Sequence, residues 1–200
     1  MLVDVVLYGG ELDLLRARLD YLQADETIVV EGDRYFTNEW KGFSFRDVQD
    51  EFPGVRYWPV TSREYSDPWR NEFHQRSDAH YLLQQLSLPD DAIVGLFDAD
   101  EIPDRDLIRA TPELSAWWME KFQGSAFWYQ QTELTGVSGA WRYLQGANLA
   151  DVRRARNSLP ALRGGFHLSS FGTLEETVSK WNGFSHQELN RPNMAEWVEN

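Results

Sequence analysis

The chain has 200 residues, of which 42% are hydrophobic and 26% charged, an ordinary composition for a globular protein with a sizeable core. Its 19 basic and 32 acidic side chains give a formal net charge of -13. This charge argues against tight nucleic-acid binding, which needs a basic surface to neutralise phosphates. The absence of cysteine excludes disulfides, thiolate zinc sites and cysteine nucleophiles. The sequence has no apolar run near the ~20 residues of a membrane span and no signal-peptide pattern, so we expect a cytoplasmic protein.

The first half of the chain alternates between short apolar runs and helical patterns. We expect strands at residues 3–8, 27–30, 55–60 and 92–97, and helices at 11–23 and 69–86. Strands that alternate with helices in this way predict an α/β sheet with parallel strands.

The second half is less regular. We expect a helix at residues 112–122, an aromatic-rich strand at 125–134 and a strand or loop that begins at Arg163. Thr173 and Glu176 have the spacing of a capping box at the start of a short helix. This half therefore predicts a mixed portion that completes the sheet.

The most informative segment places the acids Asp98, Asp100 and Glu101 directly after the apolar run 92–97. Ligands of open α/β sheets bind beyond the carboxyl ends of the strands. Neighbouring carboxylates repel each other, and a hard divalent cation with oxygen ligands would compensate for this. On an extended backbone, Asp98 and Asp100 would point the same way. A metal held there can bridge the diphosphate of a nucleotide sugar and neutralise the leaving group.

The acidic motif is also compatible with three alternatives to a metal site of this kind. It is typical of a solvated acidic turn that begins a helix. A phosphatase of the haloacid-dehalogenase type would use Asp98 as the nucleophile that attacks phosphorus. A non-catalytic carbohydrate-binding relative would depend on aromatic side chains instead, for which the candidates are Trp117, Trp118, Trp128 and Trp141.

Short motifs in a fixed order along the chain resemble glycosyltransferase family 17. The most specific match is Asp-Ala-Asp-Glu-Ile-Pro at residues 98–103, and Gly-Gly-Phe-His at 164–167 resembles the Gly-Trp-His of the family. The other matches are Glu11 to Leu15, Arg18-Leu19, Ile28 to Glu31, Phe36-Thr37, Lys41, Arg70, Arg76, Lys180, Phe184 to His186 and Glu188.

The resemblance implies a GT-A-type nucleotide-sugar-binding fold, in which helices flank a mostly parallel central sheet and the C-terminal part is mixed. It also implies a nucleoside diphosphate sugar donor, a divalent metal (Mn²⁺ or Mg²⁺) and inversion at the anomeric carbon. We expect one glycosyltransferase domain over residues 1–200. Its nucleotide-sugar-binding α/β part would be 1–110, and 111–200 would complete the acceptor site. A bacterial or bacteriophage member is the natural interpretation.

The motif and the resemblance together predict the site residues. Asp98, Asp100 and Glu101 are the expected catalytic residues, and Asp98, Asp100 and His167 are the expected metal ligands. An inverting transfer also needs a carboxylate base, for which Glu101, Glu133 and Glu188 are equal candidates. The residues expected to bind the nucleotide sugar are Glu11, Glu31, Lys41, Arg70, Arg76 and His186. The enzyme would transfer a hexose or N-acetylhexosamine to a saccharide, a protein or a modified base.

Overall fold

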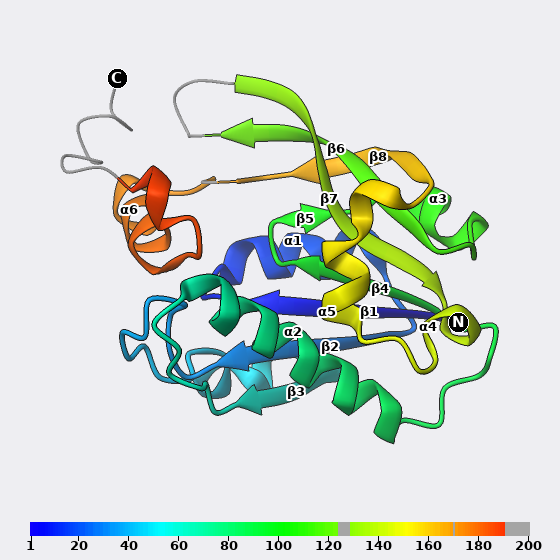
Figure 1. Cartoon of the computed structure of the whole chain (residues 1–200), viewed down its shortest axis with the longest axis horizontal. Coiled ribbons are helices and arrows are strands. Elements are labelled where there is room, and N and C mark those ends of the chain that lie inside the picture. The colour runs from blue at the N-terminus through cyan, green and yellow to red at the C-terminus, as the bar shows by residue number, and fades with distance from the viewer. Residues whose placement is uncertain (124–128, 170, 191–200) are drawn as a thin grey trace.

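The computed structural model describes residues 1–123, 129–169 and 171–190, which form a twisted sheet with helices packed around it (Figure 1). The described strands make one eight-stranded sheet with the order β3-β2-β1-β4-β7-β6-β8-β5. In chain order the elements are β1 (Leu2–Tyr8), α1 (Leu12–Leu22), β2 (Glu26–Gly32), η1 (Phe45–Asp47), η2 (Gln49–Glu51), β3 (Val55–Val60), α2 (Pro68–Gln85), β4 (Ile93–Asp98), β5 (Glu101–Ile102), α3 (Arg105–Ala110), β6 (Ser115–Gln123), β7 (Tyr129–Ala140), α4 (Trp141–Leu144), α5 (Leu149–Arg154), η3 (Arg156–Ser158), β8 (Ala161–His167), α6 (Leu174–Gly183) and η4 (Gln187–Leu189).

The first four strands form the parallel half of the sheet that the sequence predicts. β1 pairs with β2 and β4, and β2 pairs with β3, all in parallel. Val5 of β1 packs in a cluster with Leu82 of α2, whereas the next residue, Val6, packs in a cluster with Leu15 of α1. The two helices therefore cover opposite faces of the sheet, which explains why these strands are apolar throughout.

The second half of the sheet contains strands of both directions. β7 is antiparallel to β4 and β6, β8 is parallel to β6, and β5 is antiparallel to β8. The predicted helix at 112–122 is wrong, because this segment forms β6. Trp117 and Met119 are buried while Trp118 and Glu120 are only half-buried, which is the period of two of a strand. The predicted strand at 125–134 lies partly outside the described residues, and its described part belongs to β7.

The sheet curls back on itself at the turn between β4 and β5. β4 ends at Asp98 and β5 begins at Glu101, yet β7, β6 and β8 separate these strands in the sheet order. Two linking residues can span this separation only if the far edge of the sheet returns to the carboxyl end of β4. Gly165 of β8 has a φ of +91°, and a Cβ there would overlap the carbonyl oxygen of Ile102. The backbone of β8 is therefore packed directly against the β5 backbone that follows the acidic turn.

Helix α6 lies at the same edge of the sheet, beside the carboxyl ends of the parallel strands (Figure 1). The predicted capping box is confirmed: Glu176 N–H donates to Thr173 Oγ1, and Glu176 Oε2 accepts the Thr173 N–H at 2.7 Å. At the other end of α6, the Gly183 carbonyl accepts the N–H of Phe36 at 3.0 Å. Both ends of α6 are thus fixed. None of the described helices has the length and apolar character needed to cross a membrane.

Candidate active site

The candidate site is built on the turn from β4 to β5. Asp98 is the last residue of β4, Asp100 lies in the turn and Glu101 begins β5. The extended backbone expected between Asp98 and Asp100 ends at Asp98. The acids consequently divide between two sets of partners.

Asp98 and Glu101 share the guanidinium group of Arg153, which comes from α5. Arg153 donates to the two carboxylate oxygens of Glu101 at 2.8 Å each, and to Asp98 Oδ2 at 3.1 Å. Arg76 of α2 binds Asp98 as well, with Nη1 3.0 Å from Oδ1. Burial alone would raise the pKa of Asp98, but the two guanidinium groups hold that pKa below its usual value. Glu101 is 2% exposed and also accepts the Asp98 N–H, so its placement favours holding the turn over reacting with a substrate.

Beneath the turn, Arg18 of α1 forms a second buried anchor. It donates to the two oxygens of Asp4 on β1 at 2.7 and 2.6 Å, and also to the backbone carbonyl of Glu101. The guanidinium group therefore links α1, β1 and the acidic turn. A buried cation of this kind is tolerated because every side has a hydrogen-bond acceptor.

Asp100 faces a different set of groups. Its Oδ2 lies 2.6 Å from Lys180 Nζ of α6 and 3.4 Å from His167 Nε2 of β8. Burial alone would raise the pKa of Asp100, but Lys180 and His167 hold it well below its usual value. Burial would likewise lower the pKa of His167, whereas the adjacent Asp100 raises it to about 10. The space beside Asp100 therefore favours positive charge.

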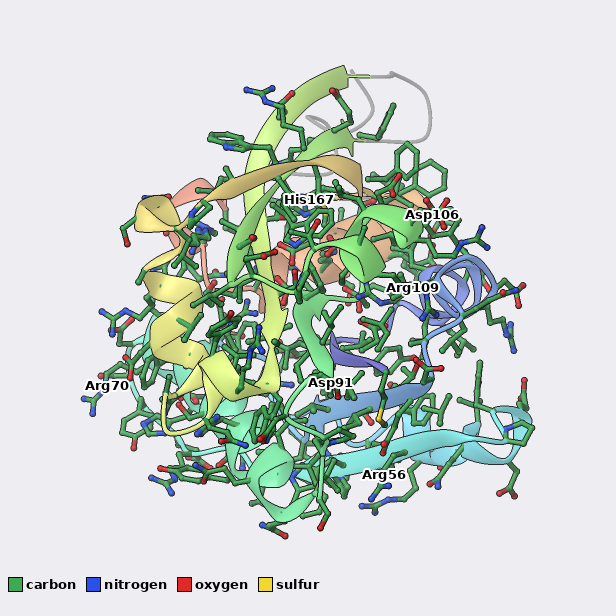
Figure 2. The ribbon with its side chains drawn as sticks, turned by 90° about the vertical axis from the view of Figure 1, so that its right-hand side faces the viewer. Arg56, Arg70, Asp91, Asp106, Arg109 and His167 are labelled. Atoms are coloured by element: carbon green, nitrogen blue, oxygen red, sulfur yellow. The ribbon has the colours of Figure 1, made fainter. Side chains whose placement is uncertain are left out.

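His167 is held from its other side by a second carboxylate. Its Nδ1 lies 2.9 Å from Glu133 Oε2 of β7, and the same oxygen lies 2.9 Å from Lys121 Nζ of β6. His167, the last residue of β8, lies in the upper part of the view in Figure 2. Three neighbouring strands thus contribute to the orientation of one imidazole ring.

Asp100 and His167 fit a divalent cation that takes two ligands from the protein. Carboxylate oxygen suits Mn²⁺, and the imidazole nitrogen would join it once the cation replaces the proton on the ring. Two donors that bind one cation at ~2.1 Å and at right angles lie ~3 Å apart, and the observed separation is 3.4 Å. Among the described residues no three or more histidine or acidic side chains converge as a metal site, and Asp98, the third predicted ligand, is paired with arginines instead. The donor and water would supply the remaining ligands.

Glu11 and Arg76 are the predicted nucleotide-sugar residues that lie at the acidic turn. Glu11 Oε1 lies 3.2 Å from Lys180 Nζ, and Glu11 Oε2 accepts the N–H of Gly9 at 2.9 Å. Glu11 therefore connects the loop between β1 and α1 to Lys180, which in turn contacts Asp100. Arg76 is buried against Asp98 and Glu72.

Glu31 and Lys41 form a separate buried pair with a distance of 3.0 Å. Glu31 is 0% exposed. It also accepts bonds from the Ser44 N–H at 2.8 Å and from the Tyr57 hydroxyl at 2.9 Å. The oxygens of Glu31 therefore hold the loop that precedes η1 against β3, and a nucleotide contact of Glu31 or Lys41 stays a prediction.

Arg70 and His186 lie on the rim of the molecule. The Arg70 guanidinium stacks on the ring of Tyr65 at 4.2 Å, and its side chain points outward (Figure 2). His186 is exposed, with Nδ1 2.6 Å from Glu188 Oε1 and its ring edge-on to Trp69 at 4.2 Å. A role for either residue in donor binding stays a prediction.

The tryptophans singled out for sugar stacking mostly serve the core. Trp117 and Trp141 are buried, and Trp117 donates its indole N–H to Ser138 at 2.9 Å. Trp118 is half-buried, while Trp128 lies outside the described residues.

Three cations at the turn were not predicted to be catalytic, metal-binding or donor-binding residues: Arg18, Arg153 and Lys180. One signal for Arg153 was present, because it lies in the basic stretch 153–156 of an otherwise acidic chain. Buried carboxylates need cationic partners, so an unexplained basic stretch was a reasonable place to look for them. Arg18 and Lys180 stood out only through the family resemblance.

Comparisons with known proteins identify the family of the chain. Residues 1–197 match the family model described as glycosyltransferase family 17. Among solved structures, the chain is similar to a nucleoside-diphosphate-sugar pyrophosphorylase from Vibrio cholerae RC9, with 9% identity and a TM-score of 0.37 over 86% of this chain and 93% of that chain. No curated protein matches the chain.

Proposed function

The chain belongs to glycosyltransferase family 17 and is therefore a glycosyltransferase. We propose that it transfers a hexosyl or N-acetylhexosaminyl group from a nucleoside diphosphate sugar to a hydroxyl acceptor. The transfer proceeds with inversion and with a divalent metal, on a GT-A-type fold. The observation that carries this proposal is the position of Asp100. It is an ionised, buried carboxylate beside His167 and Lys180, at the carboxyl ends of parallel strands.

In the reaction, the acceptor oxygen forms a bond to the anomeric carbon as the bond from that carbon to the diphosphate oxygen breaks. The electron pair leaves with the nucleoside diphosphate, and the acceptor proton passes to a base. Lys180 reaches Asp100 from α6, and there it would donate to the diphosphate. Positive charge at this point stabilises the developing charge of the leaving group. Mn²⁺ or Mg²⁺ held by Asp100 and His167 would supply Lewis-acid charge there.

The three candidate bases differ in how freely they can accept a proton. Glu101 is buried, with both oxygens bonded to Arg153. Burial would raise the pKa of Glu133, but His167 and Lys121 lower it to about 2, so this carboxylate is a weak base. Glu188 is exposed at the rim, and its contact with His186 lowers its pKa as well. Glu188 is the base we propose because, of the three, it is the one whose carboxylate is exposed to an incoming acceptor.

The phosphatase alternative has less support. A nucleophilic Asp98 would need a free oxygen, whereas both of its oxygens are paired with Arg76 or Arg153. For the acceptor, the net charge of -13 favours a saccharide or a protein over a modified base in nucleic acid.

The test is the release of nucleoside diphosphate from a panel of nucleotide sugars, with Mn²⁺, with Mg²⁺ or with a chelator. Asp100→Asn should lower turnover by about 100-fold or more, because it removes the charged ligand of the metal that would stabilise the leaving group. Asp106→Asn is the matched control: its side chain is 87% exposed on α3, and its turnover should equal that of the wild type.

Each contrary result has a distinct meaning. Full activity in the chelator would refute metal dependence. Release of inorganic phosphate, lost in Asp98→Asn, would favour the phosphatase. Thermal stabilisation by saccharides without any turnover would favour a binding protein.

A further inference from the structure

We propose that Glu133 is a positioning residue that holds the His167 imidazole with its Nε2 atom toward Asp100. The inference rests on the proposed metal site, because it explains how one of the two protein ligands is oriented. It assigns Glu133 a role other than that of the catalytic base.

The strand register brings the participating side chains together. Lys121 of β6 is the direct neighbour of His167 on β8 and of Gln131 on β7. Glu133 stands two residues from Gln131, which makes it the diagonal partner of Lys121, a position within reach of long side chains. Glu133 therefore reaches across β6, and its Oε2 lies 2.9 Å from both Lys121 Nζ and His167 Nδ1.

The geometry of the ring links this contact to Asp100. The two nitrogens of an imidazole lie on different sides of the ring, so a partner that fixes Nδ1 also fixes the direction of Nε2. In His167, Nε2 lies 3.4 Å from Asp100 Oδ2. Without Glu133 the ring would keep its contact with Asp100 but lose the charged group that fixes Nδ1.

Lys121 has a separate task in this cluster. It is mostly buried, with a side chain 14% exposed, and its ammonium group lies beside Glu133 Oε2. The ion pair restrains the carboxylate, so that Glu133 meets the ring in one orientation. A carboxylate behind a metal-binding histidine typically strengthens metal affinity 10–100-fold.

The experiment measures the affinity for Mn²⁺ alone by the electron paramagnetic resonance signal of the free ion, so no turnover is needed. Glu133→Ala should weaken Mn²⁺ binding by about 10–100-fold. Glu133→Gln keeps an oxygen that can accept the Nδ1 proton, and should recover part of that loss. Glu133→Asp keeps the charge but draws it back by one methylene, and should bind as weakly as the alanine variant.

Glu113→Gln is the control, because Glu113 lies just before β6, away from this cluster, and should bind Mn²⁺ as the wild type does. Melting curves check that each variant folds, and if Glu133→Ala does not, the comparison of Asp with Gln still decides. Wild-type affinity in the Ala and Asp variants would overturn the inference and leave the proposed function intact. A wild-type protein that does not bind Mn²⁺ would overturn the metal site, and this inference with it.

Discussion

Replacement of Arg153 by methionine should destabilise the fold, because it leaves buried carboxylates without their shared guanidinium group. Arg153 bonds to both oxygens of Glu101, which is 2% exposed, and to Asp98. Removing one partner of a buried ion pair costs about 3–5 kcal/mol. Asp98 keeps Arg76, so the loss falls mainly on Glu101 and we expect about 3 kcal/mol, the lower end of that range. For a chain of this size that corresponds to a fall in Tm of roughly 6–12 °C.

Urea unfolding of a double-mutant cycle isolates this interaction. In the Glu101→Gln background, Arg153→Met should cost less by about 1 kcal/mol or more, the size of coupling found between contacting groups, because no buried charge is then left unpaired. Arg154→Met is the matched control: this exposed neighbour stacks over Phe73 and should change the free energy of unfolding by only about 0.5 kcal/mol. An equal cost of Arg153→Met in both backgrounds would refute the reasoning.

Two further substitutions test other parts of the structure. Glu31→Gln should lower the free energy of unfolding by about 1–3 kcal/mol, since buried donors lose a charged acceptor. A KM for the nucleotide sugar that rises about tenfold in the folded variant would support the predicted nucleotide contact, and an unchanged KM would contradict it. Gly165→Ala should lower Tm far more than Gly10→Ala. Both glycines have positive φ, but only at Gly165 would a Cβ overlap backbone atoms, those of Ile102. Equal melting curves for the two variants would contradict the close packing of β8.

The parallel half of the fold could be predicted from the sequence because its strands are buried on both faces. A strand such as Leu2–Tyr8 is then a continuous apolar run, which periodicity detects directly. The pattern over β6 does not indicate a strand, because Trp117 and Trp118 are adjacent and both apolar, which hides a period of two. Which face each indole takes is decided by the neighbouring strands β7 and β8, and a single sequence does not state this.

The acidic motif could be found in the sequence, whereas most of its partners could not. Asp98, Asp100 and Glu101 stand out because they follow an apolar run. Their cations, Arg153 and Lys180, are brought to them by the packing of α5 against α2 and by the docking of α6, and no sequence spacing expresses either. The hydrogen bonds of Glu31 could not be predicted from the sequence either, because the loop that donates to its carboxylate reaches it only in the folded chain.

The order in which this chain leaves the ribosome has a consequence for the acidic turn. When synthesis has reached residue 150, all three acids of the turn exist, but Arg153, His167 and Lys180 do not. Until these arrive, the carboxylates have too few cations to bury them and should remain in water. We therefore expect the parallel half to become compact first, while the acidic turn becomes ordered only after Lys180 has emerged.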